Sequence, residues 1–148
     1  MYNICEWLEN IGEDLVIQIG ATKNENLKSS FVKEYFTHTE MLMHFENADL
    51  VITQGGFGSL YDACSACKNV VCVPRCLDNG ETLAEQNSLA MVFANLNLLT
   101  ICQDQGAFEM LFDHYSNRIA EEQSEGGVDR IRSYNIGVSS ISSQIFEK

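Results

Sequence analysis

The sequence has no apolar run that approaches the ~20 residues of a membrane-spanning helix, and its start carries neither a basic region nor a long apolar stretch. From these two absences we expect no direct membrane insertion and no signal peptide. Basic side chains are also scarce, since 9 Lys and Arg stand against 21 Asp and Glu, for a formal net charge of −12. Because so acidic a surface repels phosphate backbones and anionic lipid headgroups, nucleic-acid binding is disfavoured. The sequence predicts a cytoplasmic protein that reaches a membrane face only through a partner.

The 148 residues and a hydrophobic fraction of 45% are enough for one domain with a buried core. We assign this domain to residues 1–122, because the composition then shifts to serine, glycine and charged residues. Residues 123–148 are expected to form a loose tail with one apolar patch over residues 136–146.

Four of the six cysteines follow a C-x2-C-x4-C-x3-C spacing, which raises the alternative of a zinc site. They are Cys64, Cys67, Cys72 and Cys76. The first two fall in an expected helix and the third in an expected strand, whereas structural zinc ligands usually sit in short Gly-rich turns. We therefore expect reduced thiols and no bound metal.

Short apolar runs alternate with helical patterns along the chain. Strands are expected over residues 15–20, 31–35, 49–53, 69–73 and 98–101. Helices are expected over residues 3–11, 37–46, 59–67, 81–95 and 107–122. The near-continuous apolar character of the third strand is typical of a parallel strand that is covered on both faces. The sequence thus predicts an α/β fold, a Rossmann-like parallel sheet with flanking helices.

The second expected helix has a clear beginning. Thr37 stands at the N-cap and Glu40 follows three residues later, which is the spacing of a capping box. Its apolar positions are expected to face a core: Met41, Leu42, Met43 and Phe45.

A glycine-rich turn follows the third strand and opens the third helix. Its binding residues are predicted to be Gly55, Gly56, Gly58 and Ser59. Glycines allow positive φ and a close approach to a ligand, and the helix that follows offers free N–H groups at the positive end of its dipole. Together these features could hold a diphosphate without lysine. The spacing is neither the dinucleotide G-x-G-x-x-G nor a Walker loop, and a tight turn without a ligand stays open as an alternative.

Polar side chains follow the turn at two places. Asp62 lies three residues after Ser59 on the same helical face, where a carboxylate can accept hydrogen bonds from ribose hydroxyls. Glu85 and Gln86 lie near the start of the fourth helix and could bind a sugar ring. As an alternative, Asp62 is an ordinary solvated helix residue. In the polar segment that includes Glu85 and Gln86, the alternative is that Glu81 only complements the dipole at the start of the fourth helix.

The stretch Asp49–Leu89 resembles the C-terminal donor domain of GT-B glycosyltransferases of family 28, and most closely the small soluble subunits of two-chain enzymes. The family pattern is a DLVI strand with a Gly-rich turn, an acidic residue in the next helix, a VP strand end and a GE…HQ segment. Here the last two pieces are Val73-Pro74 and Gly80-Glu81 with Glu85-Gln86. Four linked pieces in the family order are more specific than any one of them.

This resemblance implies a subunit that binds a UDP-sugar, in particular UDP-GlcNAc, for a hexosyltransferase that acts on a lipid-linked or polysaccharide acceptor. The turn residues would hold the UDP phosphates, Asp62 the ribose, and Glu85 and Gln86 the sugar. No metal or other cofactor is implied. A membrane-anchored partner would supply the acceptor site in a heterodimer, and the catalytic residues are left unassigned.

The chain departs from the family pattern in three respects. Gln54 stands where histidine is usual, and Asp62 is one methylene shorter than the usual glutamate. The FVTVGT strand and turn that family members carry ahead of the first helix is missing, and it would lie between the first and third expected strands. A truncated start, a divergent member, or residues 136–146 filling the gap are the alternatives. These departures keep open an inactive scaffold for a membrane partner, and an unrelated nucleotide-binding regulator remains a third hypothesis.

Overall fold

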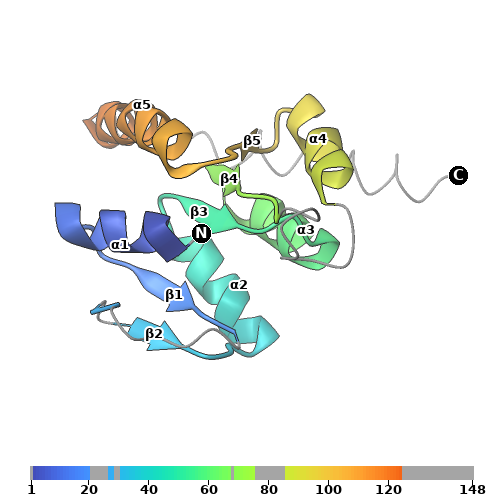
Figure 1. Ribbon diagram of the computed structural model, residues 1–148, viewed down its shortest axis with the longest axis horizontal. Coiled ribbons are helices and arrows are strands. Elements are labelled where there is room, and N and C mark those ends of the chain that lie inside the picture. The colour runs from blue at the N-terminus through green and yellow to red at the C-terminus, as the bar shows by residue number, and fades with distance from the viewer. Residues whose placement is uncertain (1, 21–26, 29–30, 68, 76–85, 125–148) are drawn as a thin grey trace, which may run out of the picture.

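The computed structural model describes residues 2–20, 27–28, 31–67, 69–75 and 86–124. Strands and helices alternate through this part of the chain (Figure 1). The helices are α1 (Tyr2–Ile11), α2 (His38–Asn47), α3 (Phe57–Ala66), α4 (Asn87–Asn95) and α5 (Gln105–Ser124). The strands are β1 (Val16–Gln18), β2 (Phe31–Lys33), β3 (Val51–Thr53), β4 (Val70–Cys72) and β5 (Thr100–Ile101). Every expected strand is present, whereas residues 81–85 of the fourth expected helix and residues 125–148 of the expected tail lie outside the described residues.

All strand pairs among the described residues are parallel. β1 pairs with β2, and β3, β4 and β5 form a second sheet in that order. In the register of the second sheet, Val51 lies beside Val70 and Cys72 lies beside Ile101. Parallel neighbours joined through helices are the βαβ arrangement that the sequence predicts, so the α/β fold class is confirmed.

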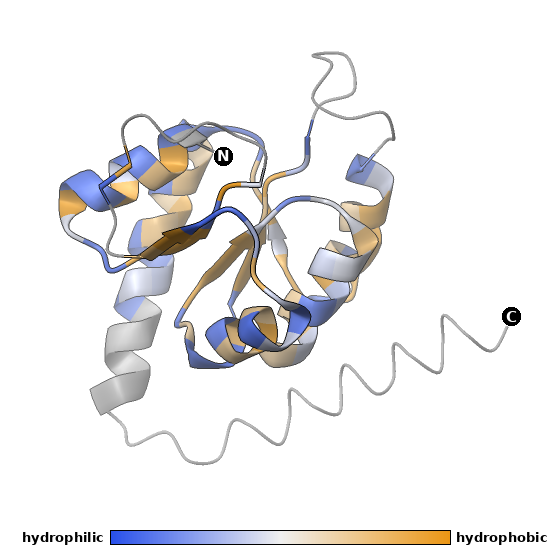
Figure 2. Cartoon of the chain, turned by 90° about the horizontal axis from the view of Figure 1, so that it is seen from below, coloured by the Kyte–Doolittle hydropathy of each residue, from blue (hydrophilic) through white to orange (hydrophobic). Residues whose placement is uncertain are grey.

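Two hydrophobic clusters lie on the two faces of the larger sheet. On one face Val70 and Cys72 pack with α3 and α4, through residues such as Leu60 and Phe93. On the other face Val71 and Val73 pack with α1 and α5. Since successive strand residues point to opposite faces, β4 is buried on both sides, and helices lie on both sides of the apolar strands (Figure 2).

The face that carries α1 and α5 is held largely by aromatic rings. Trp7 of α1 meets Phe112 edge-on at 5.4 Å between ring centroids and Phe108 at 6.0 Å. Phe108 is fully buried, and Ile4 and Leu8 fill the space beside it. The N-terminal helix is therefore an integral part of the core.

The described strands form two sheets and not one, and the break falls between β1 and β3. Val73 donates from its backbone N–H to the carbonyl oxygen of Thr53 at 2.8 Å, so Thr53 faces β4. Because alternate residues of a strand face opposite neighbours, the backbone of Ile52 faces away from β4. No other strand among the described residues pairs with that edge of β3.

The prediction that the apolar residues of α2 face a core is confirmed for Phe45 and wrong for Met43. No residue of α2 is buried; Met43 is 51% exposed, and Phe45 is only partly buried against the core. Successive helical residues turn by about 100°, so Met43 lies on nearly the opposite face from Met41 and the two residues cannot share one core. The helix packs beside α3 and not on the face of a sheet.

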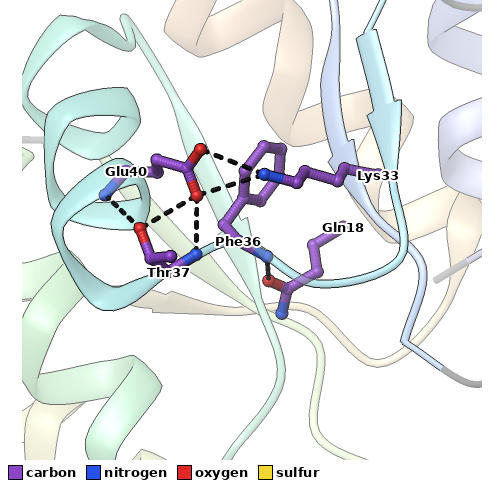
Figure 3. A network of polar contacts seen from close by, with 5 residues as sticks. All are labelled: Gln18, Lys33, Phe36, Thr37 and Glu40. Carbon is purple, nitrogen blue, oxygen red and sulfur yellow. Dashed lines mark hydrogen bonds and ion pairs between the residues drawn. The ribbon is translucent and has the colours of Figure 1, made fainter.

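The capping box at the start of α2 is confirmed (Figure 3). The backbone N–H of Glu40 donates to Thr37 Oγ1, and the backbone N–H of Thr37 donates to Glu40 Oε2 at 2.7 Å. Lys33 at the end of β2 adds an ion pair to Glu40 at 3.0 Å. Gln18 of β1 accepts a hydrogen bond from the backbone N–H of Phe36 at 2.8 Å. These contacts fix the beginning of α2 against the ends of β1 and β2.

The same contacts predict an acid-sensitive beginning of α2. The Thr37 backbone N–H, followed by Lys33 and the Thr37 hydroxyl, lowers the pKa of Glu40 from 4.5 to about 2. The cap therefore stabilises the folded state above pH 4.5 and is lost as the pH falls towards 2. An NMR titration of the Glu40 carboxyl should give a midpoint well below 4, and Lys33→Met should raise that midpoint. A wild-type midpoint at 4.5 would contradict the network.

Candidate functional site

The turn between β3 and α3 brings bare backbone N–H groups to the carboxyl edge of the larger sheet. Gly56 is the N-cap of α3, with φ −73° and ψ 136°, and no side chain caps the helix. The first helical hydrogen bond runs from Leu60 N–H to the carbonyl oxygen of Gly56 at 3.0 Å. The N–H groups of residues 57–59 therefore have no partner within the helix, as expected of a first turn. An anion is the natural partner for such groups.

The glycines of the turn act by leaving space and not by unusual backbone angles. Among the described residues positive φ is found at Gly12, Gly20 and Asn97, so the expectation of positive φ in the turn is wrong. An added Cβ at Gly56 or Gly58 would meet no described atom within 4 Å. Among the described residues, no atom therefore lies where a side chain at Gly56 or Gly58 would begin.

Gly55 has a different role, because it is buried against the start of α4. A Cβ at this position would lie 2.7 Å from the Cβ of Gln86, which is closer than real Cβ contacts. The backbone N–H of Gly55 donates to Gln86 Oε1 at 3.2 Å. Gly55 therefore packs against protein, and the open part of the turn is residues 56–59.

Asp62 lies one turn into α3, on the side that faces α2. One of its carboxylate oxygens is 3.0 Å from His38 Nε2, and the side chains of Asp62 and His38 are 25% and 70% exposed. The sequence pattern did not predict this pair. The two residues are 24 positions apart, and only the packing of α2 beside α3 brings them together.

Gln86 joins the turn to the end of the next strand. Its side-chain oxygen accepts hydrogen bonds from the N–H groups of Gly55 and Arg75, at 3.2 and 3.1 Å, and the residue is only 7% exposed. The predicted partner Glu85 lies outside the described residues. Ser59 is exposed in the first turn of α3. The structure therefore brings the Gly turn and Gln86 into contact, with Asp62 farther along the same helix.

The cysteine thiols near α3 are built into the core. Burial raises the pKa of Cys64 to about 12 and that of Cys72 to about 11. The Cys67 thiol lies 3.4 Å from the carbonyl oxygens of Ala48 and Asn69. Protonated buried thiols are poor metal ligands, and no cluster of three metal-ligating side chains occurs in the part of the chain that the structure describes. Cys76 lies outside that part.

A parallel sheet with helices on both faces and an open Gly turn at a strand's carboxyl end defines a nucleotide-binding class of α/β domain. The model of the glycosyltransferase family 28 C-terminal domain matches residues 4–124, and the chain belongs to this family. Membership implies a glycosyltransferase domain that binds a nucleotide-sugar donor. No curated protein and no solved structure matches the chain. Within residues 2–124, as far as they are described, no helix has the length and apolarity to cross a membrane.

Proposed function

We propose that the chain binds a UDP-sugar, UDP-GlcNAc in particular, as the donor subunit of a hexosyltransferase that acts on a lipid-linked or polysaccharide acceptor. The observation that carries the proposal is the N-terminus of α3, which no side chain caps and where no described atom lies within 4 Å of a Cβ added at Gly56 or Gly58. With a net charge of −12, the chain can hold a diphosphate only through local groups such as these N–H donors.

The proposed roles follow the order of the groups along the site. Gly55, Gly56, Gly58 and Ser59 make up the turn that receives the diphosphate. Asp62 receives the ribose hydroxyls, with His38 holding one of its carboxylate oxygens. Glu85 and Gln86 take the role of contacting the donor sugar. No residue of the described chain is assigned as the catalytic base, which we place on a membrane-anchored partner that also binds the acceptor.

Titration calorimetry with UDP tests the donor site through Asp62. Asp62→Ala should weaken UDP binding by about 10- to 100-fold, because hydrogen bonds to a charged group are worth about 1.5–3 kcal/mol. Asp113→Ala is the matched control, since Asp113 is an exposed carboxylate on α5, which covers the other face of the sheet. The control should bind UDP as the wild type does. Absence of UDP binding by the wild type, or equal affinity in both variants, would overturn the proposal.

A second candidate function is a catalytically inactive member that serves as a scaffold for a membrane partner. Gln54 favours it, since a neutral amide at the usual histidine position can hydrogen-bond but cannot shuttle a proton. Recovery of a membrane subunit by affinity purification, together with absent UDP binding, would select the scaffold over the donor subunit.

A further inference from the structure

Gln86 makes contacts that a sugar-binding side chain does not need. Its single side-chain oxygen accepts from the N–H of Gly55, which follows β3, and from the N–H of Arg75, which follows β4. One amide therefore connects the exits of two neighbouring parallel strands (β3 and β4), at the edge where the Gly turn begins. We call this pair of hydrogen bonds the Gln86 bridge.

The bridge and the turn fix each other in position. A Cβ on residue 55 would lie 2.7 Å from Gln86 Cβ, 3.1 Å from its Oε1 and 3.3 Å from its backbone oxygen. Gly55 is thus pressed directly on Gln86, and the next residue, Gly56, is the N-cap of α3. Because Gly55 contacts Gln86 and Gly56 is the next residue, a shift of Gln86 would also move the N-cap of α3.

An amide suits the Gln86 bridge better than a carboxylate or an apolar side chain. A carboxylate at position 86 would accept the same two N–H groups, but it would place a buried negative charge beside the site proposed for a diphosphate. An apolar side chain of the same length would bring no charge and would leave both N–H groups without this acceptor, and the N–H of Gly55 is buried. A carboxylate at position 86 therefore tests the electrostatics of the turn, whereas an apolar side chain tests how the turn is held in shape.

We propose that Gln86 is a positioning residue for the diphosphate: its amide oxygen holds the Gly turn so that the N–H groups at the start of α3 point to the phosphates. The inference rests on the proposed donor site, although the bridge itself does not. The effect is confined to the phosphates, since Asp62 and His38 are placed by the packing of α2 on α3 and not by Gln86. UDP and uridine are therefore the two ligands that distinguish a positioning role from a merely structural one.

Three measurements on the full chain test the bridge, namely amide hydrogen exchange, UDP binding and uridine binding by NMR titration. Gln86→Met should speed exchange at Gly55 and Arg75 by about tenfold and weaken UDP binding by about tenfold, with uridine binding unchanged. Gln86→Glu should keep the slow exchange and still weaken UDP binding by tenfold or more, because of charge repulsion. Met91→Ala, on the exposed side of α4, is the control and should change none of the three.

The outcomes separate the two proposals. Wild-type protein that binds no UDP would end the donor proposal, whereas unchanged exchange at Gly55 and Arg75 in Gln86→Met would end the bridge. Equal losses of UDP and uridine affinity would show a structural role and overturn positioning. If Gln86→Met does not fold, Gln86→Asn takes its place, because its amide is one methylene too short to reach both N–H groups, and the same results are expected.

Discussion

A Gly56→Asp variant should fold as well as the wild type and bind UDP at least about 100-fold more weakly, since like charges about 4 Å apart repel by several kcal/mol in a partly dry site. The backbone of Gly56 has φ −73°, which any residue adopts, and no described atom lies within 4 Å of an added Cβ. Aspartate is also a better N-cap than glycine by a few tenths of a kcal/mol. The substitution therefore leaves the fold alone and places a fixed carboxylate where the diphosphate is proposed to bind.

Gly56→Asn is the matched control for this prediction, because asparagine has the same shape and caps a helix equally well but carries no charge. It should weaken UDP binding less than aspartate does, and both variants should unfold at or above the wild-type temperature. Calorimetric titration and thermal unfolding give the two readouts. UDP affinity unchanged in Gly56→Asp would mean that the phosphates do not bind over the start of α3.

Phe93→Ala should destabilise the protein by about 3–5 kcal/mol, the usual cost of removing a fully buried aromatic side chain. Phe93 is 1% exposed and belongs to the cluster that joins α4 to α3 and to β4. Its ring also meets Phe57, the first residue of α3, at 6.3 Å. Phe93→Ala therefore removes packing from the part of the core directly beneath the proposed donor site.

Met91→Ala serves as the control, because Met91 lies on the same helix and is 55% exposed. Its free energy of unfolding should stay within about 0.5 kcal/mol of the wild type, as is usual for surface positions. Urea unfolding of both variants gives the comparison. A cost below about 1 kcal/mol for Phe93→Ala would show that the cluster is not packed as described.

Much of the fold could be read from the sequence because its signals are local. The capping box joins Thr37 and Glu40, three residues apart, and was predicted with its geometry. Alternating apolar runs gave every strand and the parallel α/β class. The four linked motif pieces gave the family, and its model then matched residues 4–124. The features that were predicted correctly depend on residues close together in the sequence, so their pattern is present before the chain folds.

Other features depend on which elements become neighbours in space. The exposure of Met43 depends on how α2 is rotated over α3, which composition does not encode. The His38–Asp62 pair depends on the same packing. The shape of the turn differed from expectation because glycine permits positive φ but does not require it.

The sequence by itself determined the Gly-rich turn, the acidic residue one turn after it and, through the family pattern, the nucleotide-sugar class of donor that the family implies. Tertiary structure decided how the turn is held. Gln86 reaches Gly55 across 31 positions and Arg75 across 11, at hydrogen-bond distance. The physical reason is that a hydrogen bond acts over about 3 Å, so a contact between distant positions exists only after the sheet has brought their strand ends together.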